Sequence, residues 1–301
     1  MPLLLLILVA ALAGLGVVAL ASVFPEANPA APASITAATS AVGETVSHHR
    51  RLRRFVSNRL DPKVLTGLGL SLALLFVVGG GLVLAVLAYL VRSNPQLRHI
   101  DNGVARWGND HAGPVSTHGL DVVTQLGSVY VVVGLTLLVA VVESIRAPSR
   151  WIVPFLVVVL TGEEVLTTAV KDLAHRARPV LNPIAATLGP SFPSGHSATA
   201  AAFYAAAALL LARRRSARWR SLLAGAAVGV AVGVAASRVL LDVHWLSDVI
   251  AGLALGWAWF AVCSIAFGGR LLRYAAPAEK VVQAAEKAGP TARDRREPVA
   301  R

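Results

Sequence analysis

Charged residues are scarce in this chain. Only 15% of its 301 residues are Asp, Glu, Lys or Arg, whereas a soluble domain usually carries about 25%. Hydrophobic residues make up 55% of the sequence, and the mean hydropathy is +0.65. This composition argues against a water-soluble globular protein and directs attention to the apolar stretches of the chain.

Cysteine and acidic residues are also few. The single cysteine, Cys263, excludes an intramolecular disulfide, and no Cys/His spacing typical of a zinc site is present. The 16 acidic residues stand against 28 Lys and Arg, which leaves a net charge of +12. Nucleic-acid binders can carry such a charge, but neither of the Arg-rich runs 50–54 and 213–220 belongs to a recognisable nucleic-acid-binding fold. We therefore expect no nucleic-acid partner.

Long apolar stretches are abundant, and each approaches the roughly 20 residues that cross a bilayer core. Several are rich in Gly and Ala, which allows membrane helices to pack closely. Two of them are short, so their helices are expected to continue into the polar flanks. The seven stretches are 2–24, 64–91, 128–145, 151–170, 197–212, 222–238 and 248–268.

The positive residues are unevenly divided between the connections. If the seven stretches span the membrane, 21 of the 28 Lys and Arg fall on one side and seven on the other. The positive-inside rule places the richer side in the cytoplasm. The connections 92–127, 171–196 and 238–247 are then expected on the extracytoplasmic face, and the C-terminus in the cytoplasm.

Residues 1–24 resemble the apolar part of a signal peptide but lack its positive n-region. Cleavage would also leave the Arg-rich segment 50–63 outside, against the charge rule, so an uncleaved helix is the preferred interpretation. Residues 25–63 combine an Ala/Pro-rich linker with that cytoplasmic segment. The basic tail 269–301 is expected to be disordered or to lie on the membrane surface.

The late extracytoplasmic connections hold three polar clusters, and the charge-derived topology brings all three to one membrane face. The clusters are Lys171 to Arg178-Pro179, Pro193-Ser194-Gly195-His196, and Ser237-Arg238 through His244 to Asp248. Because that topology was obtained without the clusters, their convergence predicts a shared site.

The chemistry of these clusters suits a phosphoryl group. Lys171, Arg178 and Arg238 supply cations, and the Arg fork matches phosphate oxygens. Ser194 stands at an N-cap position, so the amide of Gly195 is expected at a helix N-terminus, where anions bind. A second group of side chains supplies the reactive functions.

His244 and Asp248 are four residues apart and are expected to share a face on the first turn of the last helix. Asp248 can then hold one imidazole nitrogen and leave the other as a nucleophile. His196 is available as a general acid.

With these motifs the chain resembles the type-2 phosphatidic acid phosphatase (PAP2) superfamily of membrane lipid phosphatases. The family patterns KxxxxxxRP, PSGH and SRxxxxxHxxxD are all present without departure. The resemblance covers roughly 64–268, where a six-helix catalytic domain is implied. It therefore predicts an all-α polytopic membrane bundle, a six-helix PAP2-like core with one additional N-terminal transmembrane helix.

The resemblance also implies a role for each motif residue. Lys171, Arg178, Ser194, Gly195 and Arg238 would hold the phosphate. His244 would form a phosphohistidine, oriented by Asp248, and His196 would protonate the leaving alcohol. No cofactor or metal is implied, because the cations neutralise the phosphate charge.

The resulting expectation is a plasma-membrane hydrolase of a lipid phosphomonoester or pyrophosphate, such as phosphatidate, phosphatidylglycerophosphate, diacylglycerol pyrophosphate or undecaprenyl pyrophosphate. The dominance of Arg over Lys, together with abundant Ala, Gly and Val, suggests a bacterium. A phosphotransferase using the same phosphohistidine, or a non-catalytic lipid-phosphate binder or transporter, remains as an alternative. A soluble vanadate haloperoxidase is disfavoured by the membrane spans.

Three polar residues stand outside these assignments. Arg176 lies within the first motif but off its named positions, and a solvated interfacial role is favoured for it. Glu163 and Glu164 fall inside an apolar stretch, where a carboxylate is costly and usually faces the bundle interior. A protonated Glu hydrogen-bonded within the bundle is the favoured interpretation, and a part in shaping the lipid cavity is the alternative.

Overall fold

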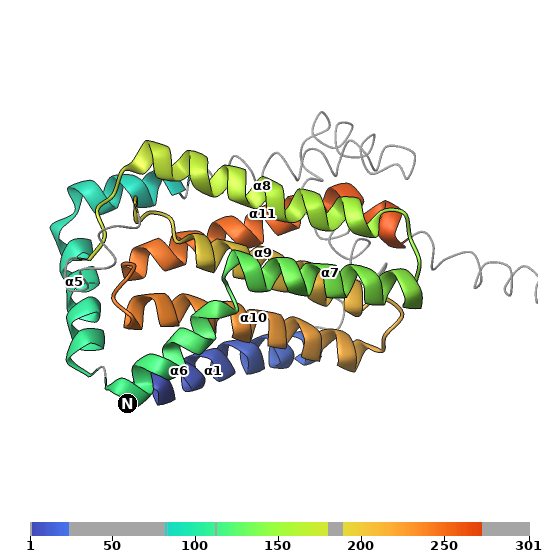
Figure 1. The fold of residues 1–301 in the computed structure, drawn as a ribbon, viewed down its shortest axis with the longest axis horizontal. Helices are drawn as coiled ribbons and strands as arrows, with labels where there is room; N and C mark the ends of the chain where they lie inside the picture. Colours follow the sequence, from blue (N-terminus) through green and yellow to red (C-terminus); the bar gives the residue numbers. More distant parts are fainter. Residues whose placement is uncertain (1, 24–81, 83, 112, 180–188, 273–301) are drawn as a thin grey trace, which may run out of the picture.

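The computed structural model describes residues 2–23, 82, 84–111, 113–179 and 189–272, which fold into a bundle of helices (Figure 1). All regular secondary structure among these residues is helical, which confirms the predicted all-α class. The predicted linker 25–63, the first part of the stretch 64–91 and the tail beyond Leu272 lie outside the described residues.

Most of the described helices coincide with predicted apolar stretches, but two further helices lie in the predicted connection 92–127. In chain order the described helices are α1 (Pro2–Val23), the helix Leu84–Ser93, α5 (Pro95–Asp110), α6 (Pro114–Gln125), α7 (Val129–Arg146), α8 (Ile152–Ala174), α9 (Gly195–Leu211), α10 (Ala217–Leu240) and α11 (Leu246–Leu272). As expected, α10 extends well into the polar flanks of its apolar stretch, and α9 begins within the PSGH motif.

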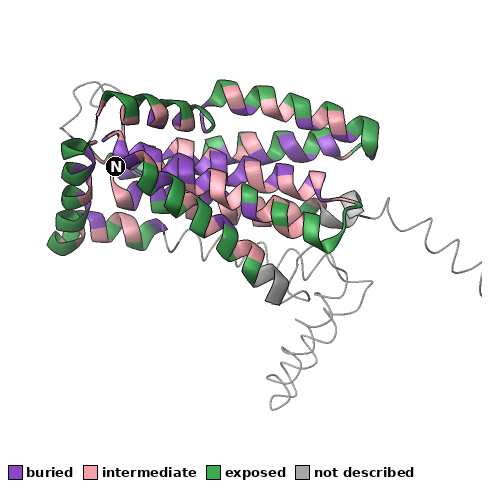
Figure 2. Cartoon of the chain, turned by 90° about the horizontal axis from the view of Figure 1, so that it is seen from below, coloured by how far each residue is buried: buried purple, intermediate pink, exposed green. Residues whose placement is uncertain are grey.

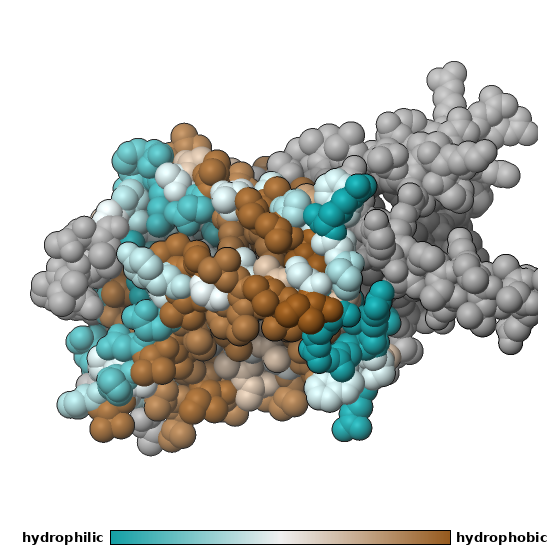
Figure 3. All heavy atoms as spheres, turned by 45° about the vertical axis from the view of Figure 1, so that its right-hand side comes forward, coloured by the Kyte–Doolittle hydropathy of each residue, from teal (hydrophilic) through white to brown (hydrophobic). Residues whose placement is uncertain are grey.

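Five of the described helices are long and apolar enough to cross a membrane, namely α1, α7, α8, α10 and α11. The helix Leu84–Ser93 and α9 are apolar but shorter. Figure 3 shows an apolar belt around the middle of the molecule with hydrophilic residues towards both ends. Exposed large side chains such as Leu137 and Leu138 contribute to this surface, which suits a bundle embedded in lipid.

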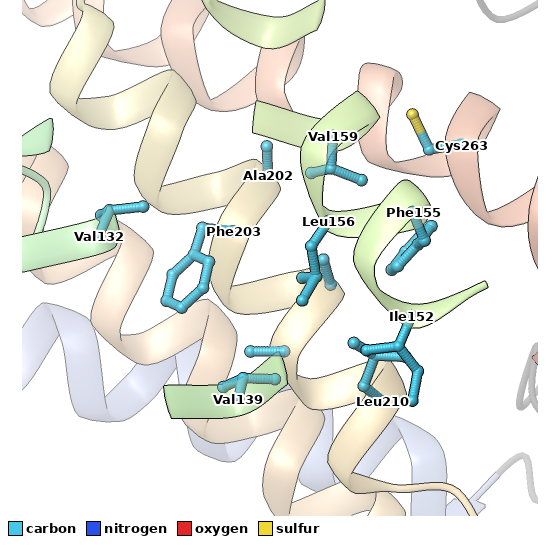
Figure 4. Close-up of a cluster of buried hydrophobic side chains, with 12 residues drawn as sticks. Val132, Val139, Ile152, Phe155, Leu156, Val159, Ala202, Phe203, Leu210 and Cys263 are labelled. Atoms are coloured by element: carbon cyan, nitrogen blue, oxygen red, sulfur yellow. The ribbon is translucent and has the colours of Figure 1, made fainter. Parts of the chain in front are cut away.

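Helix α9 forms the centre of the bundle and packs against α7, α8, α10 and α11. Its many alanines allow this, and Figure 2 shows the buried residues concentrated in the middle of the bundle. The main apolar cluster joins α7, α8, α9 and α11 through residues such as Phe155, Leu156, Phe203 and Cys263 (Figure 4). Cys263 is buried, as predicted.

Two glycines of α11 allow it to approach α9 unusually closely. A Cβ atom on Gly252 would lie 2.5 Å from the carbonyl oxygen of Ser194, and one on Gly256 would lie 2.2 Å from that of Ala198. Such distances leave no room for a side chain, so the beginnings of α9 and α11 are held together. These are the helix ends that carry the PSGH and HxxxD motifs.

The additional N-terminal helix α1 packs along α10 and touches α6. Gly14 and Gly225 meet at the crossing, since a Cβ on either one would come within 2.7 Å of the carbonyl oxygen of the other. Leu6 of α1 joins Leu120 and Leu240 in a small apolar cluster near the end of α10. The N-terminal stretch therefore contributes to the bundle and supports the helix that carries Arg238.

Candidate active site

The motif residues gather at one end of the bundle. Helices α8 and α10 end there, α9 and α11 begin there, and α5 lies across that end (Figure 1). Asn94 starts α5 by accepting hydrogen bonds from the amides of Gln96 and Leu97, at 2.9 and 3.2 Å. The alternation of helix directions thus brings motifs that are distant in the sequence to one place.

His244 is 2% exposed and lies in the turn between α10 and α11. The expectation that it belongs to the first turn of α11 is therefore wrong: α11 begins at Leu246, and the amide of His244 donates instead to the carbonyl oxygen of Arg238, at 3.2 Å. Asp248 lies in the first turn of α11 and accepts the amide of Trp245, at 3.0 Å. This bond caps the helix and directs the carboxylate back towards His244.

The two ring nitrogens of His244 have different neighbours. Nε2 lies 3.0 Å from Nη1 of Arg178, and Nδ1 lies 3.5 Å from Oδ2 of Asp248 and 3.4 Å from Oγ of Ser191. Because Arg178 can only donate, Nε2 must be an acceptor, and the proton of the neutral ring is assigned to Nδ1. The ring therefore presents a lone pair on the side of the cations.

Burial determines the protonation of this imidazole. It lowers the pKa of His244 to about 4, and the charge of Arg178 acts in the same direction, while the bond with Asp248 opposes both. His244 is consequently neutral near pH 7. Burial also lowers the pKa of Arg178, against the opposing charge of Asp248, but a guanidinium remains protonated throughout the physiological range.

Arg178 is held by backbone carbonyls on both sides of the site. Its Nε donates to the carbonyl oxygen of Gly189 at 3.0 Å, Nη1 to that of Val243 at 2.8 Å, and Nη2 to that of Pro190 at 3.3 Å. These bonds fix the guanidinium beside His244. The position agrees with the predicted role of Arg178 in binding phosphate.

Lys171 approaches the start of α9 from the last turn of α8. Its Nζ lies 3.5 Å from the position that a Cβ on Gly195 would occupy, which is an ordinary van der Waals distance, so Lys171 lies beside the first residue of α9. Ser194 is the N-cap residue, but its hydroxyl accepts from Ser197 at 2.9 Å and makes no side-chain capping bond. The amide of Ser194 donates to the carbonyl oxygen of Asp248 at 3.0 Å.

Arg238 completes the predicted set of cations from α10. Its side chain is buried, and Nη1 donates to Oγ1 of Thr124 at 3.1 Å. Within the described part of the chain, its Nε is buried and has no hydrogen-bond partner. A buried donor without a partner is costly, so this atom suits a ligand oxygen. Burial lowers the pKa of His196 to about 3, and the charges of Arg238, Lys171 and Arg178 act in the same direction.

Comparison with known proteins identifies this arrangement. The PAP2 superfamily model matches residues 151–271. This part of the chain is similar to the PAP2 superfamily. The matched segment contains α8 to α11 and all three motifs, so the sequence-based recognition is confirmed.

Two relatives of the PAP2 segment extend the comparison. A transmembrane PAP2-type phosphatidylglycerolphosphate phosphatase from Bacillus subtilis has a crystal structure that matches with a TM-score of 0.57 and 22% identity, over 72% of this chain and 98% of that one. A lipid A 1-phosphatase of Rhizobium johnstonii is 39% identical over 72 residues, which cover 24% of this chain and 25% of the relative. The first likeness confirms the predicted membrane-bundle fold.

The sequence-based interpretation of Arg176 as a solvated interfacial residue is wrong. Its side chain is 13% exposed and forms ion pairs with Asp101 and Asp248. The only hint in the sequence of a role in the site was the position of Arg176 between Lys171 and Arg178. Its partner Asp101 lies on α5, 75 residues away. Sequence spacing gives no indication of that contact.

Ser191 was also missed. It is fully buried, and its hydroxyl donates to Oδ2 of Asp248 while its oxygen lies near Nδ1 of His244. Its place just before the PSGH motif is the only sequence signal. The carboxylate of Asp248 is therefore held by Ser191 and Arg176 as well as by the start of α11.

An open cavity of about 310 Å³ adjoins this region. Apolar side chains such as Phe192 line it together with basic ones such as Arg98, and Arg176 and Trp245 belong to its wall. None of the predicted phosphate-binding or catalytic residues lines it. The cavity thus borders the site without containing its reactive groups.

Glu163 faces the bundle interior, as expected for a carboxylate in a span. It is 1% exposed and accepts hydrogen bonds from Thr167 at 2.7 Å and Thr199 at 2.9 Å. Glu164 is exposed. No group of three or more His, Cys, Asp or Glu side chains suited to a metal ion occurs among the residues with defined placement, and the expectation of a metal-free reaction stays a prediction.

Proposed function

We propose that this protein is an integral membrane phosphatase that hydrolyses a lipid phosphomonoester or pyrophosphate through a phosphohistidine on His244. The observation that carries the proposal is the geometry of the buried His244 ring. Its Nε2 lone pair faces Arg178 at 3.0 Å, while Nδ1 faces the carboxylate of Asp248 at 3.5 Å. Binding alone requires no such oriented nucleophile.

The phosphate would be held by cations from three separate segments, namely Lys171, Arg178 and Arg238. The amide of Gly195 and the hydroxyl of Ser194 would add donors at the start of α9. The unpartnered Nε of Arg238 and the closeness of Lys171 to Gly195 support this assignment. Fixed donors of this kind stabilise the charge that develops during phosphoryl transfer.

In the first step, the Arg178 donor near Nε2 turns to a phosphate oxygen, and the freed lone pair attacks phosphorus. A bond forms between Nε2 and phosphorus as the bond from phosphorus to the lipid oxygen breaks. The leaving oxygen takes a proton from His196, whose charged form the incoming phosphate favours. The positive ring of the phosphohistidine is stabilised by Asp248.

In the second step, water attacks phosphorus and gives a proton to His196. The bond between Nε2 and phosphorus breaks, inorganic phosphate leaves, and both histidines return to their starting states. The three cations neutralise the phosphate charge, so no metal enters this scheme.

The substrate class follows from the apolar belt around the bundle. A lipid phosphate can reach the site from the membrane while its headgroup meets the cations. Charge asymmetry supports an extracytoplasmic site, because 21 of the 28 Lys and Arg belong to the opposite side of the topology. Phosphatidylglycerolphosphate, lipid A 1-phosphate, phosphatidate and undecaprenyl pyrophosphate are the candidates to compare.

The experiment is phosphate release by the purified full-length protein in nanodiscs from each of these lipids, with and without a metal chelator. His244→Ala provides the catalytic control, and the exposed His118→Ala is its matched histidine control. We expect release from at least one lipid, unaffected by chelator and by His118→Ala, and abolished by His244→Ala.

Other outcomes separate the alternatives. Release that survives His244→Ala, or that requires a divalent metal, would overturn the mechanism. Transfer of phosphate to an added lipid or sugar acceptor in preference to water would indicate a phosphotransferase. Tight binding of a lipid phosphate with no release from any substrate would indicate a binder or transporter.

A further inference from the structure

Arg176 connects two buried carboxylates from distant parts of the chain. Its Nη2 donates to Oδ2 of Asp101 at 2.8 Å, and its Nη1 donates to Oδ1 of Asp248. Asp101 on α5 is 1% exposed, and Asp248 is fully buried. One guanidinium thus neutralises charge on both, and its planar fork makes this double contact possible.

Ser247 ties the same network to the backbone of α11. Its amide donates to Oδ1 of Asp101 at 3.0 Å, and its hydroxyl donates to Oδ2 at 2.6 Å. The hydroxyl oxygen in turn accepts from Nη1 of Arg176 at 2.8 Å. Helix α5, which lies across the end of the bundle (Figure 1), is thereby fastened to the start of α11.

Trp245 covers the guanidinium from another direction. The centre of its ring lies 5.3 Å from Cζ of Arg176, and its Nε1 donates to the carbonyl oxygen of Ala177 at 2.9 Å. The aromatic face and the ion pairs together confine Arg176 to one position. The contacts of its side chain are with Asp101, Ser247, Asp248 and Trp245.

We propose that Arg176 and Asp101 are a positioning pair that holds the Asp248 carboxylate in its orientation beside His244. The proposal rests on the proposed function in treating His244 as the nucleophile. It adds α5, which precedes the segment matched by the family model, to the machinery of the site. Arg176 acts through Asp248, which its guanidinium contacts directly.

The charged groups that face His244 determine the pH at which its imidazole titrates. Arg178 lies beside Nε2, Asp248 beside Nδ1, and the charge of Arg238 also reaches the ring. His196 interacts with it from α9. Loss of Arg176 would leave the negative charge of Asp248 less compensated, and this charge favours the imidazolium form of His244. The titration midpoint of His244 should therefore move to higher pH.

The experiment compares Arg176→Gln, Arg176→Lys, Asp101→Asn and the double variant Arg176→Gln/Asp101→Asn with the wild type in nanodiscs. Arg106→Gln is the matched control, because Arg106 is an exposed arginine on α5. Two readouts are taken: kcat and KM for the best lipid substrate, and the midpoint of His244 in histidine-labelled NMR, assigned with His244→Gln.

We expect Arg176→Gln to lower kcat about 10- to 100-fold, the effect of losing a hydrogen bond to a charged group, with little change in KM and an upward shift of the His244 midpoint. Arg176→Lys should keep the midpoint near the wild-type value, because the charge remains. Asp101→Asn should lower kcat less, because Arg176 still reaches Asp248.

The double variant distinguishes a role of the pair in positioning Asp248 from a role in folding alone. Arg176→Gln alone leaves Asp101 buried and uncompensated, and this can unfold the protein. The double variant removes that charge, so it should fold, yet its His244 midpoint should stay shifted and its kcat low. If folding, midpoint and kcat all return to wild-type values in the double variant, the pair is structural only and the proposal is overturned.

Failure of the proposed function would give a different result. Because the NMR midpoint does not depend on turnover, a shift in Arg176→Gln without phosphatase activity in the wild type would support the positioning pair and reject the phosphatase. An active wild type with no shift and no loss of kcat in Arg176→Gln would reject only the pair.

Discussion

Nε2 of His244 and Nη1 of Arg178 lie 3.0 Å apart, so the lone pair that would attack phosphorus is occupied by an arginine donor. The same guanidinium is fixed by the carbonyl oxygens of Gly189, Pro190 and Val243. A phosphate entering the site would offer Arg178 a better, charged acceptor. Binding of the substrate and release of the nucleophile would then be a single event.

Replacement of Arg178 with Lys should lower kcat/KM by about 100-fold, because an ammonium group cannot keep the carbonyl contacts and also meet phosphate oxygens with a planar fork. Steady-state phosphate release measures the loss. Arg98→Lys is the control, since Arg98 is exposed on α5. A loss of less than about threefold would show that only the charge at position 178 matters.

The low pKa of His244 predicts how stability depends on pH. The pKa is about 4 in the folded protein and 6.5 is the ordinary value, so the unfolded chain binds the proton first as the pH falls. Wild-type protein should therefore lose stability relative to His244→Gln between pH 6.5 and 4, by about 3 kcal/mol in total. Thermal unfolding of both proteins across this range tests the sign.

A parallel stability loss in wild type and His244→Gln would contradict a neutral, buried His244.

Asp248→Asn supplies a second check by NMR. The bond with Asp248 raises the pKa of His244, so its removal should move the midpoint of His244 to still lower pH. This direction is opposite to that expected for Arg176→Gln.

The crossing of α1 and α10 predicts a sharp difference between two glycines of one helix. A Cβ on Gly14 would lie 2.7 Å from the carbonyl oxygen of Gly225, whereas one on Gly16 would meet nothing within 4 Å. Gly14→Leu should destabilise the protein by about 1–3 kcal/mol through overpacking, and Gly16→Leu should not. Unfolding in detergent micelles measures both, and equal effects would contradict the packing of α1 described above.

An ion pair at the opposite end of the bundle predicts a stability effect remote from the site. Arg213 donates from Nη2 to Oε2 of Glu143 at 3.0 Å, and the side chains are 8% and 5% exposed. Arg213→Gln should cost about 3–5 kcal/mol by leaving a buried carboxylate without its partner. The exposed Arg214→Gln is the control, and a similar stability of both variants would show that the Glu143 pair contributes little.

Much of the fold followed from hydropathy, because a membrane helix must be apolar over its length. The boundaries of α7, α8 and α11 therefore lie close to their apolar stretches. Hydropathy carries no information on which polar residues meet across the bundle, so the bond between Arg176 and Asp101 was not predicted. The position of His244 before α11 was missed as well, because Trp245 at the N-cap has none of the usual capping chemistry.

The residues of the three motifs could be named from the sequence because their spacing is fixed by helix ends. Ser191 and Asp101 could not, since nothing distinguishes them from other polar residues of the connections until the chain is folded. The Asp248 carboxylate is oriented by Arg176 and Ser191, which precede α9, and by the amide of Trp245 just before α11, while Asp101 of α5 holds Arg176 in turn. Such three-way contacts are a property of the fold and not of any local pattern.

The most direct test of His244 as the nucleophile is to trap the phosphoenzyme. Full-length protein is mixed with a ³²P-labelled lipid phosphate that it hydrolyses, quenched within milliseconds in base, and the labelled peptide is identified by mass spectrometry. The phosphohistidine mechanism predicts a base-stable, acid-labile phosphate on His244, absent in His244→Ala and present in Arg106→Gln. Turnover with no labelled histidine, or with the label on another residue, would contradict it.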